Sequence, residues 1–320
     1  MRSIVLVALL SLALNGAGPA GCETRQGNGA QNVKKSGNNN VPATPTHESE
    51  TNKDVDNNLK VLAEGGQSGV DDAFVAVARD VQTYEALREM ASQLPEVNAD
   101  SFGTNAVVAA FLGRRNTGGY GVQVIRAGDG AIRLAESRPP KGAVVTQSLT
   151  TPFKVVSVPI SDVQPLSLEM EGEWKTMTRP YSVATATFTV TGGFAGTSED
   201  FRLEGDIGVM RAGKLATLAF DLKTTGQTKA RTLKDVATGV VLADGSIKIT
   251  HMAAGSLVSP PPSALRANGN FDDGENKLAL TFESLPSNVA DGYQGKGGLE
   301  ATATAPPPQK RKSLGGNNPI

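Results

Sequence analysis

Short stretches in which apolar and polar residues alternate follow one another from residue 163 onward. Because successive side chains of a strand point to opposite faces, such alternation predicts β-strands. Turn signals such as Gly192-Gly193 and Asp244-Gly245 separate the stretches. Strands are expected at residues 166–174, 181–191, 201–209, 214–223, 236–242, 246–252, 265–271, 278–283 and 298–304. Many short strands with regular turns predict an antiparallel β-sandwich or barrel over residues 163–304.

Residues 67–162 show a mixed pattern instead. Apolar residues recur at helical spacing over residues 81–93, with Asp80 placed to cap the helix and Pro95 to end it. Further strands are expected at residues 73–78, 106–112, 120–125, 131–136, 144–149 and 153–158. The sequence therefore predicts a small α+β domain followed by an all-β domain, giving an α+β fold that is predominantly β.

The chain starts with the pattern of an export signal. Arg2 precedes an apolar run at residues 4–14, which is too short to span a membrane as a helix. The small residues that follow lead to Cys22 in the sequence Pro19-Ala20-Gly21-Cys22, which resembles the lipobox of bacterial lipoproteins. This predicts a signal peptide at residues 1–21 and a Cys22 that carries palmitate or similar acyl chains. The alternative is an ordinary secreted protein with an incidental cysteine.

An acylated Cys22 would anchor the chain to a membrane of the bacterial cell envelope. Glu23, by resemblance to lipoproteins of bacteria with two membranes, favours the outer membrane over the inner one. Residues 22–66 lack aromatic residues and are rich in Asn, Gly and Thr, so they predict a disordered tether in which His47 is solvated. Residues 305–320 predict a disordered tail.

Composition narrows the possible chemistry. Lys and Arg number 31 against 32 Asp and Glu, and this balance argues against a nucleic-acid partner. One Cys and two His are too few for a disulfide, a cysteine-rich zinc site or a histidine cage. We therefore expect no metal, no cofactor and no catalytic residues. A hydrolase that uses His251 as its base is a minor alternative, because no Gly-x-Ser-x-Gly motif accompanies it.

Two further motifs partly match known ligand-binding loops, but neither has the full pattern that such a loop requires. Gly113 and Gly118 have the spacing of a phosphate-binding loop, but Gly119 stands where that loop requires lysine. Asp272-Asp273-Gly274 brings oxygen ligands together, yet it lacks the full spacing of a calcium loop and is typical of a hairpin turn.

Residues 107–124 carry the most specific pattern in the chain. An apolar strand leads to Gly113 and two arginines, then to Thr117-Gly118-Gly119-Tyr120 and a second strand. Pro140, Gln147 and Thr150-Thr151-Pro152-Phe153 follow in order. Over about residues 70–160 this order resembles the C-terminal domain of the PrcB family, named after a lipoprotein subunit of a spirochaete surface protease complex. Asn116 and Phe153 depart from the usual Pro and Tyr of the family.

The motif allows two interpretations. In the first, its glycines take positive φ and simply close a hairpin. In the second, the motif is an exposed docking edge, because Arg and Tyr are enriched where proteins bind each other. The candidate binding residues are then Arg114, Arg115, Thr117, Gly118, Gly119 and Tyr120.

The resemblance implies a non-catalytic interaction or assembly subunit of a surface or periplasmic protease complex. Its partners would be the membrane, through Cys22, and a protein, which could be a protease. The alternative is a lipid-anchored carrier whose β domain encloses an apolar cavity for a small ligand.

Overall fold

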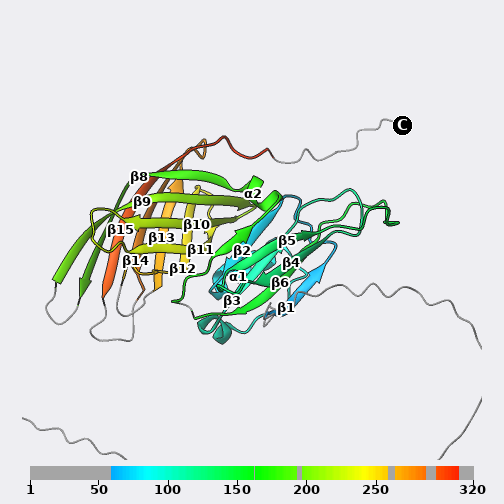
Figure 1. The fold of residues 1–320 in the computed structure, drawn as a ribbon, viewed down its shortest axis with the longest axis horizontal. Helices are drawn as coiled ribbons and strands as arrows, with labels where there is room; N and C mark the ends of the chain where they lie inside the picture. Colours follow the sequence, from blue (N-terminus) through cyan, green and yellow to red (C-terminus); the bar gives the residue numbers. More distant parts are fainter. Residues whose placement is uncertain (1–58, 162, 193–196, 259–263, 286–292, 310–320) are drawn as a thin grey trace, which may run out of the picture. The chain divides into compact units, whose positions relative to one another are not determined.

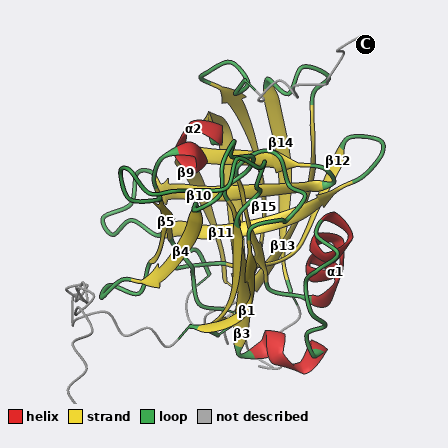
Figure 2. Cartoon of the chain, turned by 90° about the vertical axis from the view of Figure 1, so that its right-hand side faces the viewer, coloured by secondary structure: helices red, strands yellow, loops and turns green. Residues whose placement is uncertain are grey.

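The computed structural model describes residues 59–309 except 162, 193–196, 259–263 and 286–292. The predicted signal peptide, Cys22, His47 and the last residues of the predicted tail lie outside the described residues. All described residues belong to one compact unit, Asn52–Ile320. Strands dominate this unit, and short helices lie beside them (Figure 2).

The part of the described chain before residue 179 is called the first folded region. A four-stranded antiparallel sheet forms its core (Figure 1). Its strands, in spatial order, are β1 (Lys60–Gly65), β6 (Phe153–Pro159), β3 (Asn105–Phe111) and β2 (Phe74–Ala78). Both faces of β2 and β3 are buried, which explains why they form continuous apolar runs in the sequence.

Order begins earlier than predicted, because β1 lies inside the range 22–66 assigned to the tether. Its short apolar run, Val61-Leu62-Ala63, ends a long polar stretch of sequence. The strand pairs with β6, and Leu62 and Ala63 pack against the core. Because β6 lies about 90 residues further along the chain, no local pattern announces this pairing. At the C-terminal end of the barrel region, the Ala305 carbonyl accepts a hydrogen bond from Arg179 Nε at 2.9 Å. Ala305 therefore belongs to the folded part of the chain, and the predicted start of the disordered tail is too early.

Helix α1 (Val81–Met90) follows β2, and Asp80 caps it as predicted by accepting a hydrogen bond from the Thr83 N–H at 2.9 Å. The short 3₁₀ helix η1 (Ala99–Gly103) leads into β3. Tyr84 and Leu87 are the fully buried side chains of α1. The helix therefore presents one apolar face to the core.

A second, smaller sheet has the order β4 (Gly121–Arg126), β5 (Ile132–Ser137) and β7 (Leu168–Met170). Because β3 and β4 belong to different sheets, the prediction that residues 113–119 close a hairpin between paired strands is wrong. The turn instead carries the chain from one sheet to the other.

Two predicted strands of this region are also wrong. Residues 144–149 form a loop in which Val144 is fully exposed, because no strand among the described residues pairs with them. Residues 166–174 hold only the three-residue β7 and then turn into α2 (Glu173–Met177). Gly172, with φ +61°, breaks the strand between the two elements.

The all-β region is a closed antiparallel barrel, which decides between the sandwich and barrel predicted for residues 163–304. The spatial order is β10-β11-β12-β13-β14-β15-β8-β9 (Figure 1). The strands are β8 (Arg179–Gly192), β9 (Thr197–Ala212), β10 (Leu215–Thr224), β11 (Thr232–Val241), β12 (Ser246–Ala253), β13 (Ala264–Phe271), β14 (Lys277–Ser284) and β15 (Gln294–Ala303).

Side chains fill the interior of the barrel in the part that the structure describes. The rings of Phe220 and Phe282 meet edge to face with centroids 6.0 Å apart, although β10 and β14 are not neighbours in the barrel. Tyr181 and Phe271 make a similar contact at 6.3 Å. The apolar cavity that the ligand-carrier interpretation requires is therefore occupied by core residues at these levels.

The outer edge of β2 is bonded to the barrel through two threonines. Thr217 Oγ1 donates to the Val75 carbonyl at 2.6 Å, and the Val77 N–H donates to Thr238 Oγ1 at 2.7 Å. These side chains satisfy backbone groups that would otherwise be buried without partners. The two folded regions therefore share one buried boundary.

A buried ion pair completes this boundary. Arg79 Nη2 lies 2.9 Å from Asp235 Oδ1, and the two side chains are 1% and 0% exposed. The Asp235 carboxylate also accepts hydrogen bonds from the N–H groups of Leu166 at 2.8 Å and Ala253 at 2.7 Å. Burial raises the pKa of Asp235, while Arg79 and these backbone donors act in the opposite direction.

Candidate docking site

The turn after β3 is fastened to the segment that precedes β2. Gly113 has φ +76°, and a Cβ there would lie 2.7 Å from the Ala73 backbone nitrogen. The Arg114 N–H donates to the Asp71 carbonyl at 2.8 Å, and the Arg114 guanidinium pairs with the Asp71 carboxylate at 2.7 Å. Only glycine combines the required φ with this close approach of two backbone segments.

Arg115 lies inside the fold, which corrects the prediction that it belongs to an exposed edge. The residue is 5% exposed. Its Nη1 is 2.8 Å from Glu173 of α2, and its Nε is 3.4 Å from Glu136 of β5. Its guanidinium carbon also lies 5.6 Å from the centroid of the half-buried Tyr120 ring. Arg115 therefore joins the turn to two other elements instead of facing a partner.

The remaining motif residues hold the loop at residues 138–150. The Gly118 N–H donates to the Thr146 carbonyl at 2.9 Å, and Thr150 Oγ1 donates to the Thr117 carbonyl at 3.0 Å. A Cβ on Gly118 would collide with the Thr146 hydroxyl, and one on Gly119 would lie 2.9 Å from Pro139. The glycines are therefore required by the loop that packs on them.

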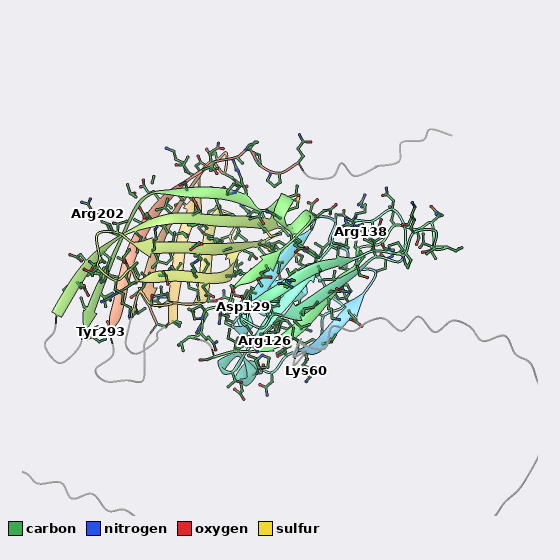
Figure 3. All side chains as sticks on the ribbon, in the orientation of Figure 1. Lys60, Arg126, Asp129, Arg138, Arg202 and Tyr293 are labelled. Carbon is green, nitrogen blue, oxygen red and sulfur yellow. The ribbon has the colours of Figure 1, made fainter. Side chains whose placement is uncertain are left out.

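Most side chains of the loop at residues 138–150 are exposed to solvent. Val144 is fully exposed and Leu149 is 54% exposed. Lys141 and Gln147 are exposed as well. Figure 3 labels Arg138, where the loop leaves β5. These exposed side chains stand on a loop whose position the motif fixes. The motif itself therefore provides the support, and the loop provides the accessible surface.

The sequence did not reveal the ionic partners of the motif or the role of the loop. Arg115 and Glu173 are 58 residues apart, so no local pattern joins them. Val144, Val145 and Leu149 are apolar residues of the kind found in strands, and this favours the strand predicted at residues 144–149. The Pro–Gly pair at Pro140 and Gly142 was the one available signal of a loop.

The candidate chemical residues lie in the barrel region. His251 lies on β12 in the barrel wall. Asp272 Oδ1 accepts a hydrogen bond from the Lys277 N–H at 2.9 Å, as expected of a hairpin turn. Among the described residues, no three His, Cys, Asp or Glu side chains gather as a metal site would require. In the same part of the chain, no helix has the length and apolar character needed to cross a membrane.

The chain was compared with curated proteins, solved structures and protein families. No curated protein matches the chain. Among solved structures, transferrin binding protein B from Haemophilus parasuis Hp5, in a Trp-176-Ala mutant, is similar with a TM-score of 0.28 and 8% sequence identity. That alignment covers 62% of this chain and 35% of the other, so the chain spans about a third of its length.

The match to a protein family falls on the motif and the loop that it supports. It starts within β3 and ends with β6, so it includes β4, β5 and the loop at residues 138–150 that follows β5. The resemblance predicted from the motif is thereby confirmed: residues 106–159 of this chain match the family PrcB C-terminal.

Proposed function

We propose that this chain is a non-catalytic, lipid-anchored protein of the bacterial cell envelope that acts as an interaction or assembly subunit of a surface or periplasmic protease complex. The observation that carries the proposal is the PrcB C-terminal match on a segment whose motif residues brace an exposed loop. In this proposal, the braced loop is the surface that a partner would contact.

The proposed anchor rests on the sequence. Cys22 follows an apolar run and small residues, and acyl chains on it would hold the folded region at an envelope membrane, the outer membrane in preference to the inner one. The tether between Cys22 and β1 would let the folded region reach a partner on the same membrane.

The proposed docking surface combines the loop at residues 138–150 with the adjoining Arg114 and Tyr120. Both of these residues are partly exposed, and Tyr120 stacks on the buried Arg115. Rigid, partly exposed aromatic and apolar groups are typical anchors of protein interfaces. Arg115, Thr117, Gly118 and Gly119 contribute by fixing the geometry.

Capture of partners by the full-length anchored chain tests the proposal. The bait is crosslinked in its native envelope, and captured proteins are quantified by mass spectrometry. We expect Val144→Asp to reduce recovery of an envelope partner by about tenfold, because a charge replaces an exposed apolar contact. Val81→Asp, at a 39% exposed site on α1, is the matched control and should leave recovery unchanged. Equal recovery with both variants, or no specific partner, would contradict the proposal.

A further inference from the structure

We infer that the basic residues Lys310, Arg311 and Lys312 dock in an acidic groove between α2 and residues 71–73. Docked there, the C-terminal segment ties the end of the barrel to the first folded region. The inference does not depend on the proposed function, because both sides of the contact belong to the same chain.

Hydrogen bonds direct the chain toward α2 after it leaves β15. The Thr304 N–H donates to the Pro180 carbonyl at 2.9 Å. The Ala305 carbonyl accepts a hydrogen bond from Arg179 Nε at 2.9 Å. Because Arg179 and Pro180 closely follow the last residue of α2 in the sequence, these bonds bring the C-terminal segment beside that helix.

The next residues line two successive cavities beside Met177, the last residue of α2. Pro307 and Pro308 line the first cavity, which has a volume of about 120 Å³. Gln309 lines the second, which has a volume of about 110 Å³ and is the acidic groove. Proline fixes φ and favours an extended chain, so this segment has little conformational freedom to lose. The chain therefore reaches the groove immediately before its basic residues.

Carboxylates give the groove its charge. Asp71, Asp72 and Glu173 line it, and none of the described residues that line it is basic. Asp71 pairs with Arg114 at 2.7 Å, and Glu173 pairs with Arg115 at 2.8 Å. Asp72 forms no salt bridge with any other residue that the structure describes. The groove therefore keeps a negative charge that the described part of the chain does not balance.

The chain supplies the complementary charges directly. Lys310, Arg311 and Lys312 follow Gln309 in the sequence. An extended chain advances by about 3.3 Å per residue, so the backbone of the third basic residue lies within about 10 Å of Gln309. Attraction between charges at this range persists at physiological salt, where the screening length is about 8 Å. The basic residues can therefore reach Asp72, which shares the groove with Gln309.

Other occupants of the groove are less well matched. A divalent cation needs several ligands in one place, and no three His, Cys, Asp or Glu side chains of the described residues gather in that way. A basic segment of another molecule must compete with a segment already attached at Gln309, whose effective concentration is in the millimolar range. The chain's own basic residues therefore have the advantage.

Zero-length crosslinking of the full-length chain tests the contact. A carbodiimide joins a lysine Nζ to a carboxylate only where the two groups touch, and mass spectrometry locates the bond. We expect amide bonds from Lys310 or Lys312 to Asp72 or to the neighbouring carboxylates of the groove. An equal mixture of isotope-labelled and unlabelled chains should give crosslinks within one chain and none that join the two.

Cleavage by trypsin supplies an independent measurement, because the enzyme cuts after lysine and arginine. A docked segment is cut only when it detaches, so the cleavage rate at residues 310–312 reports the detached fraction. We expect Asp72→Asn to raise this rate about threefold, since it removes one partly exposed ion pair. The matched control is Asp206→Asn, at an exposed aspartate of β9, and it should leave the rate unchanged.

The inference fails if no crosslink joins the basic residues to the groove, or if Asp72→Asn and Asp206→Asn are cut at the same rate. Crosslinks that join labelled to unlabelled chains would assign the groove to a second copy and would overturn the inference as well. Melting curves followed by circular dichroism verify that both variants are folded. None of these results bears on capture of an envelope partner, which tests the proposed function separately.

Discussion

Replacing Asp235 with alanine is expected to lower the free energy of unfolding by about 3–5 kcal/mol, the usual cost of removing one partner from a buried ion pair. The variant leaves Arg79 buried without its counterion. It also removes the acceptor for the N–H groups of Leu166 and Ala253. The lost ion pair and hydrogen bonds all lie where the first folded region contacts the barrel. The substitution should therefore destabilise the contact between the two regions.

Equilibrium unfolding in urea, followed by circular dichroism, measures this effect. The matched control is Glu283→Ala, which removes a pair with Arg266 at 2.7 Å whose side chains are 48% and 61% exposed for Arg266 and Glu283. Solvent screens that pair, so the control should change stability by less than about 1 kcal/mol. If Asp235→Ala were no more costly than the control, the buried pair would not hold the two regions together.

Trp174→Ala is expected to lower the free energy of unfolding by a similar amount, about 3–5 kcal/mol. The Trp174 side chain is the largest of the fully buried ones, at 1% exposure. Its indole Nε1 donates to the Phe111 carbonyl at 2.8 Å. Truncation would leave a cavity under α2 and remove a side-chain hydrogen bond to the end of β3, immediately before the motif.

Trp174→Phe separates these two contributions. It keeps most of the ring but removes the donor, so we expect a smaller loss, of about 0.5–1.5 kcal/mol, from the missing hydrogen bond. Far-ultraviolet circular dichroism is the appropriate probe because Trp174 is the single tryptophan. Equal losses for the two variants would show that packing of the indole contributes little.

The barrel strands were predictable because each buries one face against the barrel interior. In β14, for example, Leu278, Leu280 and Phe282 are buried, and the residues between them are more exposed. The closure of these strands into a barrel was not predictable. It depends on the pairing of β8 with both β9 and β15, and strand patterns alone do not specify that neighbour relation.

The missed features depend on contacts between residues far apart in the chain. Arg79 and Asp235 are 156 residues apart, and a sequence contains no local sign of their pairing. Arg115 lies in a polar, glycine-rich turn that is typical of exposed positions, yet carboxylates from β5 and α2 enclose it. The family resemblance located the motif correctly, but only the structure separates its supporting residues from the loop that they hold.

Photo-crosslinking in living cells tests the central claim most directly. A photoreactive amino acid is placed at Val144 on the exposed loop, and at Val81 on α1 as the control, in the full-length chain. We predict one dominant adduct with an envelope protein from position 144 and none of comparable yield from position 81. No adduct from position 144, or the same adducts from both positions, would contradict a docking role for the PrcB-like region.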